Sequence, residues 1–271
     1  RNDYINFFMK LSQNLKLAIE ASIKAGKKIL EIYTSDDFIV EYKSDESPLT
    51  LADKSSDEII KNALKVSNIP ILSEEGNVLD YNKRKDLRHL WIVDPLDGTK
   101  EFIKKNGEFT VNIALVENNR PTLGVIYAPA LKVLYFSEEK FGSYKLELKT
   151  STLSSLDYSR AIKLPVSINK NSYGVVTSRS HLDKETLSYI ENLKNIRSNV
   201  KSVPIGSSLK FCLLAEGTAD CYPRFSPCME WDTAAGQIIC KEAGFELIDQ
   251  TTNTEMLYNR ENLLNNSFVV K

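Results

Sequence analysis

Two carboxylates directly follow a short apolar run in the segment WIVDPLDGT. Residues 91–93 are typical of the end of a buried strand, and Asp94 and Asp97 come immediately after it. Pro95 and Gly98 are expected to interrupt the regular structure there, and Gly98 lets a ligand approach the backbone. Carboxylates beside amides that face an anion indicate a cation held between protein and phosphate.

Four further acidic residues, in three places, lie where helices or strands are expected to begin or end. Asp53 falls in the first turn of one helix, Glu74-Glu75 ends another strand, and Asp232 begins a later helix. Each has an ordinary alternative explanation, because aspartates cap helices and paired glutamates are common in solvated turns. Taken together, they form the ligand set that two hard cations sharing a phosphate would need.

Composition narrows the choice of metal and of partner. The chain has 271 residues and a net charge of −1, so no overall field attracts nucleic acid or a membrane. It contains four cysteines, none in C-x-x-C spacing, and two histidines, which favours oxygen ligands and therefore magnesium, manganese or calcium over zinc. We expect reduced thiols, a cytoplasmic protein, no signal peptide and no apolar run of about 18 residues that could span a membrane.

The elements that must position these residues follow from hydrophobic periodicity. Helices are predicted at residues 4–33, 50–66, 181–193, 208–216 and 232–243. Strands are predicted at residues 38–42, 69–72, 109–116, 123–127, 133–137, 144–148, 173–177, 200–203, 219–222 and 245–248. The central strands should form an antiparallel meander, and the second half alternates strand and helix, which predicts layered sheets and helices. Serine and threonine cluster near 150–160, so we expect subdomains at 1–155 and 156–271.

The ordered motifs EE at 74–75, DPLDGT at 94–99 and WDTAAG at 231–236 resemble the inositol monophosphatase superfamily of lithium-sensitive, magnesium-dependent phosphatases. Other segments are similar to one branch, the bacterial 3'(2'),5'-bisphosphate nucleotidases of the CysQ type. These are KSD at 43–45, GTKEFI at 98–103, NGEFTVNIAL at 106–115, SRSH at 178–181, GSSLKF at 206–211 and YPRF at 222–225. The resemblance covers about residues 40–245.

The resemblance implies an α+β fold, a layered α/β/α/β/α sandwich like that of inositol monophosphatase and fructose bisphosphatase, with the site between the subdomains. It implies two or three Mg²⁺ ions, with Mn²⁺ as a substitute. The first subdomain would carry most metal ligands, and the second would carry Asp232 and the nucleotide contacts. The implied metal ligands are Glu74, Asp94, the carbonyl of Leu96, Asp97 and Asp232.

The implied reaction is in-line attack of metal-activated water on the 3'-phosphate of 3'-phosphoadenosine 5'-phosphate, or of its phosphosulfate form, to give AMP. Asp53 and Thr99 would orient and deprotonate the water, since a threonine hydroxyl both donates and accepts, and Glu74 is a further expected catalytic residue. Leu96, Asp97, Gly98, Thr99 and Asp232 would lie around the phosphate. The nucleotide would contact His181, Ser207, Lys210 and Arg224, although Ser207 and His181 would also suit helix starts.

Other functions remain open at this point. An inositol monophosphatase or another sugar-phosphate phosphatase of the same fold would share every metal ligand, and a non-catalytic relative would bind cations without turnover. The S-x-x-K pattern at 207–210 also fits a serine acyl-enzyme, but the S-D-N element of such enzymes is absent from the sequence. The expected partner is a small molecule and not nucleic acid, with a monomer or homodimer as the assembly. The resemblance adds peripheral association with the inner face of the membrane.

Overall fold

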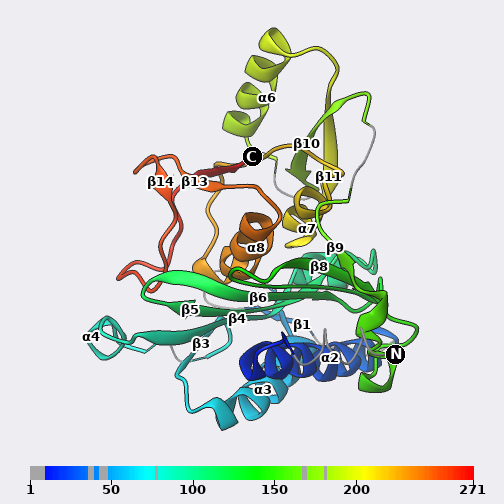
Figure 1. Ribbon diagram of the computed structural model, residues 1–271, viewed down its shortest axis with the longest axis vertical. Coiled ribbons are helices and arrows are strands. Elements are labelled where there is room, and N and C mark those ends of the chain that lie inside the picture. Colours follow the sequence, from blue (N-terminus) through cyan, green and yellow to red (C-terminus); the bar gives the residue numbers. More distant parts are fainter. Residues whose placement is uncertain (1–9, 36–39, 43–47, 77–78, 167–169, 180–181) are drawn as a thin grey trace.

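A seven-stranded sheet forms the central layer of the molecule (Figure 1). The structure is a computed structural model, and it describes residues 10–35, 40–42, 48–76, 79–166, 170–179 and 182–271. Strands β3 and β4 run parallel, and every later neighbour is antiparallel, which confirms the predicted meander. In spatial order the strands are β3 (Ile71–Ser73), β4 (His89–Asp97), β5 (Thr110–Glu117), β6 (Arg120–Ala128), β7 (Val133–Glu138), β8 (Gly142–Glu147) and β9 (Ile162–Lys163).

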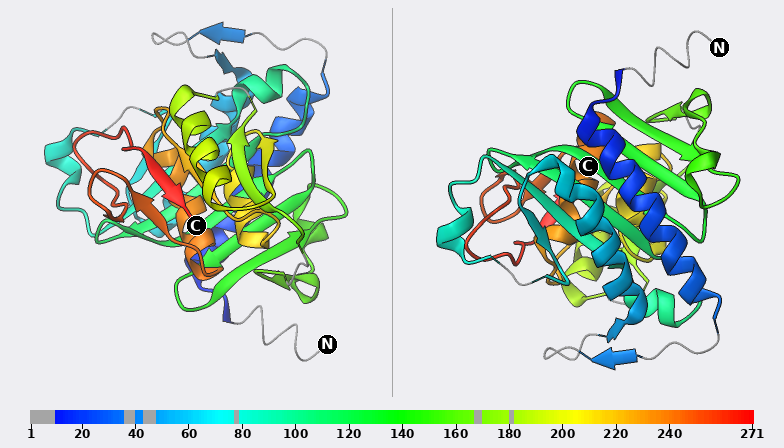
Figure 2. Two further views of the ribbon diagram at one scale, coloured as in Figure 1. Left: turned by 90° about the horizontal axis from the view of Figure 1, so that it is seen from above. Right: turned by 90° about the horizontal axis from the view of Figure 1, so that it is seen from below.

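Two long helices, α2 (Gln13–Tyr33) and α3 (Leu51–Leu64), lie side by side across one face of this sheet, as the right panel of Figure 2 shows. The predicted apolar face of α2 is buried from Leu15 to Ile32. Ser12 caps α2, so this helix begins later than the predicted residue 4, and residues 4–9 of the prediction lie outside the described residues. A small antiparallel pair, β1 (Val40–Tyr42) and β2 (Pro48–Thr50), leads into α3.

Helices α7 (Leu209–Glu216) and α8 (Glu230–Glu242) cover the opposite face of the sheet (Figure 1). A glycine allows the close contact between α8 and β6. A Cβ atom at Gly124 would lie 2.6 Å from the carbonyl oxygen of Ala235 and 2.5 Å from the side chain of Ile238. The sequence therefore permits α8, which carries Asp232, to pack directly on the sheet that carries Asp94 and Asp97.

The outer layers complete the predicted α/β/α/β/α sandwich. Parallel strands β10 and β11 lie beyond α7, a four-stranded sheet lies beside them, and α6 is outermost (Figure 1). The C-terminal strand β15, which the sequence did not predict, lies between β12 and β13. The elements are β10 (Tyr173–Ser178), α6 (Lys184–Ile196), β11 (Val200–Ile205), β12 (Tyr222–Arg224), β13 (Leu247–Asp249), β14 (Thr254–Glu255) and β15 (Phe268–Val270).

Two predicted boundaries were wrong in ways that concern the site. Strand β4 continues through Pro95 to Asp97, because a bulge between Asp94 and Asp97 takes up the irregularity that we expected to end the strand. Helix α6 begins at Lys184 after the capping residue Asp183, not at position 181. The subdomain division at 155/156 stays a prediction. Strand β9, which follows that position, still pairs with β8 of the central sheet as far as Lys163.

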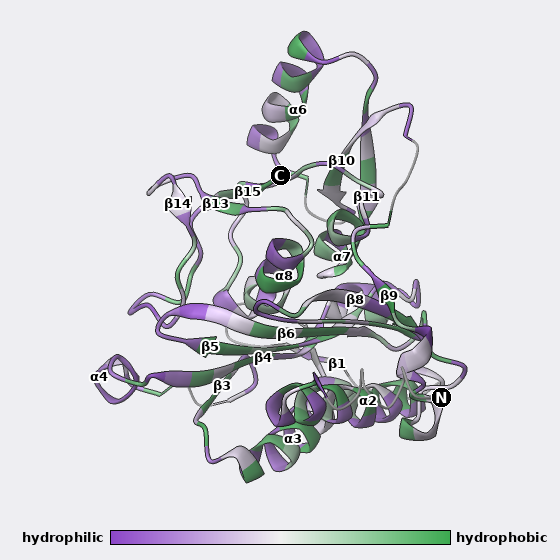
Figure 3. Cartoon of the chain, viewed as in Figure 1, coloured by the Kyte–Doolittle hydropathy of each residue, from purple (hydrophilic) through white to green (hydrophobic). Residues whose placement is uncertain are grey.

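Buried apolar residues concentrate on the sheet strands and on the helices that pack against them. Figure 3 shows apolar colouring along these strands and hydrophilic colouring on α4 (Tyr81–Arg84). All four cysteines are buried and free. Within the described part of the chain, none of the helices combines the length and the apolar character that crossing a membrane requires.

Candidate active site

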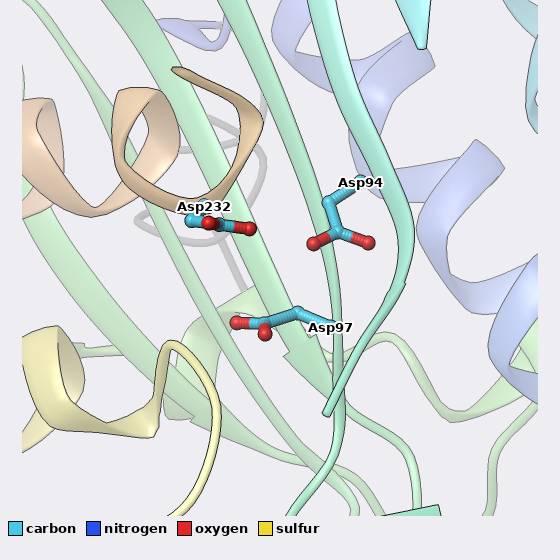
Figure 4. A group of neighbouring side chains, drawn as sticks. All are labelled: Asp94, Asp97 and Asp232. Atoms are coloured by element: carbon cyan, nitrogen blue, oxygen red, sulfur yellow. The ribbon is translucent and has the colours of Figure 1, made fainter. Parts of the chain in front are cut away.

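Three aspartates from two distant segments of the chain meet above the central sheet. Asp94 and Asp97 come from β4 and Asp232 from the first turn of α8, and Figure 4 shows their carboxylates turned toward a common space. One oxygen from each lies within 4.8 Å of the other two. The convergence predicted for these residues is therefore present in the fold.

The bulge in β4 gives Asp94 and Asp97 their positions. The amide of Leu96 donates to Asp94 Oδ1 at 3.1 Å, and the buried hydroxyl of Ser56 on α3 donates to the carbonyl of Pro95 at 2.7 Å. Because proline has no amide hydrogen, position 95 contributes only this acceptor. Helix α3 thus anchors the turn between the two carboxylates.

Burial and mutual repulsion make the aspartate cluster costly to ionise in the absence of a cation. Burial, followed by the charges of Glu74, Asp97 and Asp232, raises the pKa of Asp94 well above its ordinary value. Burial and the charge of Asp97 raise the pKa of Asp232 to about 6, against the opposing effects of the Met229 amide and nearby cations. Perturbation of this kind, in a cavity, is typical of functional sites.

The two carboxylate oxygens of Asp53 accept hydrogen bonds from different residues, Thr50 and Thr99. Its Oδ2 accepts from the amide of Thr50 at 2.7 Å and from the hydroxyl of Thr50 at 2.6 Å, which completes the predicted capping box of α3. Its Oδ1 accepts from the hydroxyl of Thr99 at 3.1 Å. Asp53 therefore both caps α3 and pairs with Thr99, as the two interpretations of the sequence proposed.

A cavity of about 260 Å³ opens beside the cluster. Glu74 lines it together with the aspartates, and Glu74 is close enough to Asp94 to raise the pKa of that carboxyl, although it is not one of the three mutually close acids. Leu96, Gly98 and Thr99 also line this cavity. Gly98 has φ +90°, and a Cβ atom there would lie 3.1 Å from the carbonyl oxygen of Glu108, so glycine is required.

Cationic side chains also line the cavity. Lys210, Arg224 and Ser207 all line it. The side chain of Lys210 is buried and its Nζ donates to the carbonyl of Ser207 at 2.6 Å. Burial lowers the pKa of Lys210 to about 8, although the nearby charge of Asp97 raises it. Arg224 donates to the carbonyls of Ser226 and Pro227 at 3.1 and 3.0 Å. His181, which the sequence also placed here, lies outside the described residues.

Sequence reasoning missed the polar groups that surround Asp97. Ser208 Oγ lies 2.6 Å and Asn112 Nδ2 lies 3.3 Å from Asp97 Oδ2. A signal for Asn112 was available, because it is an amide within an otherwise apolar strand. The sequence also left Arg179 without a role, and its guanidinium pairs with both oxygens of Glu108 at 2.7 Å.

The donor set fits a hard divalent cation. The three clustered ligands are carboxylates, they come from rigid elements, and the buried Asp94 would be poorly accommodated as an uncompensated anion. Oxygen ligands of this kind suit Mg²⁺ or Mn²⁺ better than Zn²⁺. The described residues can therefore hold a metal beside the cavity.

Comparison with known proteins agrees with this geometry. The model of the inositol monophosphatase family matches residues 10–270. The 3'(2'),5'-bisphosphate nucleotidase CysQ of Salmonella typhimurium is 42% identical over 260 residues, which cover 94% of this chain and 98% of that relative. Its counterpart in Haemophilus influenzae is 33% identical over 96% of this chain and 91% of that relative.

Solved structures show the same relationship. The crystal structure of CysQ from Bacteroides thetaiotaomicron, described as a bacterial member of the inositol monophosphatase family, matches with a TM-score of 0.89 and 46% identity over 97% of this chain and 98% of that one. The Thermotoga maritima IMPase shares the fold, with a TM-score of 0.75 and 24% identity over 96% of this chain and 92% of that one. Enzymes of this family use divalent metal. The chain belongs to the inositol monophosphatase family.

Proposed function

We propose that this protein is a magnesium-dependent 3'(2'),5'-bisphosphate nucleotidase. It hydrolyses the 3'-phosphate of 3'-phosphoadenosine 5'-phosphate to AMP, with the phosphosulfate form as a second substrate. The observation that carries the proposal is a cavity that is lined both by the aspartate cluster and by Lys210 and Arg224. A nucleoside with one phosphate on the 3' position and one on the 5' position of its ribose suits such a cavity, because one phosphate can meet the metal ligands and the other the cations. The name of the CysQ relatives describes a substrate of this form.

The metal-binding residues in this proposal are Glu74, Asp94, the carbonyl of Leu96, Asp97 and Asp232, which would hold two or three Mg²⁺ ions, with Mn²⁺ as a substitute. When bound, the metal would neutralise charge on the phosphate and on the leaving oxygen and lower the pKa of water. These five residues all line one cavity, which supports this assignment.

Asp53 and Thr99 would orient the attacking water and accept its proton. Thr99 Oγ donates to Asp53 Oδ1, so its lone pairs face away from the carboxylate and can accept a hydrogen bond from water. As the water is deprotonated, the proton would pass to the Thr99 oxygen while the Thr99 proton moves to Asp53. The buried capping contacts of Asp53 keep its other oxygen occupied and its side chain fixed.

The second phosphate would contact Lys210 and Arg224, whose fork of donors matches phosphate oxygens, with Ser207 beside them. His181 completes the proposed nucleotide contacts from the family resemblance alone. We further propose a cytoplasmic monomer or homodimer, peripheral on the inner membrane face by the same resemblance.

The decisive experiment measures phosphate release with Mg²⁺ from 3'-phosphoadenosine 5'-phosphate and from inositol 1-phosphate. We expect kcat/KM for the nucleotide to exceed that for the inositol ester by at least about 100-fold, since one additional charge-assisted contact with phosphate contributes about 1.5–3 kcal/mol and Lys210 and Arg224 can each make one. A preference for inositol 1-phosphate would replace the proposed substrate, and Mg²⁺ binding without turnover of either ester would remove the catalytic proposal.

A further inference from the structure

We propose that Ser208 and Asn112 are positioning residues that fix the carboxylate of Asp97 for metal binding. This inference rests on the proposed metal site and deepens it. Both side chains are almost completely buried, with exposed fractions of 2% and 1%. They come from different elements, since Asn112 lies on β5 and Ser208 directly precedes α7. Buried polar side chains that meet at one atom indicate a specific task for that atom.

The hydrogen bonds form a chain that ends on one oxygen of Asp97. Thr110 Oγ1 donates to Asn112 Oδ1 at 2.9 Å, which orients the Asn112 amide. The amide nitrogen of Asn112 then donates to Ser208 Oγ at 2.8 Å and also lies 3.3 Å from Asp97 Oδ2. Ser208 Oγ is 2.6 Å from the same Oδ2.

The direction of these bonds follows from the single proton of the Ser208 hydroxyl. Because its oxygen accepts from Asn112, its proton is given either to Asp97 Oδ2 at 2.6 Å or to the carbonyl of Asp232 at 3.1 Å. The shorter distance and the negative charge favour Asp97. Both donors then act on Oδ2 and hold the carboxylate in one rotational state, which assigns Oδ1 as the oxygen that faces an ion.

The same hydroxyl links the two segments that supply the acids. Ser208 Oγ contacts the side chain of Asp97 on β4 and the main chain of Asp232 on α8. Its own turn is held by the segment that precedes β5, because the amide of Gly206 donates to Glu108 Oε2 at 2.7 Å. The network therefore sets both the orientation of Asp97 and its distance from Asp232.

A purely structural role makes a different prediction, and the chain offers a matched control. Ser143 is also fully buried, and its hydroxyl donates to the carbonyl of Ile239 on the same helix α8 at 2.6 Å. Ser143→Ala removes an equivalent hydroxyl between the central sheet and α8. Ser143 lies on β8 and does not line the cavity. Loss of metal affinity specific to Ser208→Ala cannot then come from general loosening of α8.

The test measures Mn²⁺ binding by titration calorimetry to the metal-free full chain and its variants, with thermal unfolding in EDTA beside it. Outer-shell partners of metal ligands typically contribute about 10–100-fold in affinity. We expect Ser208→Ala and Asn112→Ala to raise the Kd for Mn²⁺ by about that factor. Ser143→Ala should lower Tm by a similar amount to Ser208→Ala and leave the Kd within about twofold of wild type.

The outcomes separate this inference from the function on which it rests. Wild-type affinity in Ser208→Ala and Asn112→Ala would overturn the positioning role, and if Ser208→Ala does not fold, Asn112→Ala alone decides. A Kd that rises equally in Ser143→Ala would also overturn it. A wild-type protein that binds no Mn²⁺ would remove the metal site itself, and with it both proposals.

Discussion

Replacing Lys210 with methionine should stabilise the fold while weakening the proposed bisphosphate binding. Burial lowers the pKa of Lys210 from 10.5 to about 8. At about 1.4 kcal/mol per pKa unit, keeping this side chain charged in the interior costs about 3 kcal/mol at neutral pH. Loss of the hydrogen bond to the Ser207 carbonyl offsets about 1–2 kcal/mol of the gain. We therefore expect Lys210→Met to raise the free energy of unfolding by about 1–2 kcal/mol at pH 7.

The stability difference between wild type and Lys210→Met should also change with pH, in a direction that the pKa of Lys210 determines. The pKa of Lys210 is lower in the folded than in the unfolded state, so its cost is complete below pH 8 and disappears as the pH rises from there toward 10.5. The stability advantage of Lys210→Met should shrink across that range. Urea unfolding of both proteins at pH 7 and at pH 9.5 measures it.

Binding should change in the opposite sense. A charged hydrogen bond to phosphate contributes about 1.5–3 kcal/mol, so Lys210→Met should lower kcat/KM for 3'-phosphoadenosine 5'-phosphate by about 10–100-fold. The loss for 3'-AMP, which has no second phosphate, should be much smaller. In the wild type, the ratio of the two kcat/KM values should fall about tenfold per pH unit above pH 8 as Lys210 becomes neutral.

Phosphate release from both substrates between pH 6.5 and 9.5 tests this reasoning. Equal losses for the two substrates, together with a destabilised variant at pH 7, would refute it. Lys210 would then hold the Ser207 turn and have no direct part in recognition.

Three further predictions concern the acids and their neighbours. Asp94→Asn should lower Mg²⁺-dependent turnover by at least about 100-fold, above the usual effect of an outer-shell partner. Because it removes a repelled charge, it should also raise the metal-free Tm by about 2–4 °C at pH 7; an unchanged rate would exclude Asp94 from the site. Thr99→Val should reduce kcat by about 10²–10⁴-fold with the Kd for Mn²⁺ unchanged, in steady-state kinetics and calorimetry, and a parallel loss of metal affinity would contradict the relay role. Because the pKa values of Asp94 and Asp232 are raised in the folded state, the stability of the metal-free protein should fall as the pH rises from 4 through about 6. Mg²⁺ should therefore raise Tm more at pH 7 than at pH 5. An equal rise at both pH values would show that the cluster does not bind the ion.

Local signals in the sequence predicted much of this site. The capping box at Thr50 and Asp53 depends on residues three apart, and the acids at the ends of β3 and β4 follow directly from apolar runs. Such features involve short separations in the chain, so pattern and propensity are sufficient to find them. The convergence of Asp97 with Asp232 was inferred from residue chemistry and family resemblance, not from any local pattern.

Contacts between distant segments could not be predicted from the sequence. Ser208 and Asn112 are 96 positions apart, and nothing local indicates that they share a hydrogen bond. The bulge in β4 was misjudged because Pro95 is typical of a strand end, whereas the hydroxyl of Ser56 on α3 supports its carbonyl within the continued strand. Strand β15 was missed because three apolar residues at 268–270 are too few to distinguish a strand from a tail until β12 and β13 pair with them.

Asp53 has both a structural and a proposed catalytic contact, and this combination has an evolutionary consequence. Its Oδ2 closes the first turn of α3, while its Oδ1 holds Thr99. A lineage that no longer needed the reaction would still be selected to keep aspartate here, because losing a cap of this kind typically destabilises a protein by about 0.5–2 kcal/mol. Retention of Asp53 in a descendant is thus weak evidence of activity, whereas Thr99, which has no share in that cap, is the position at which abandoned catalysis should first become visible.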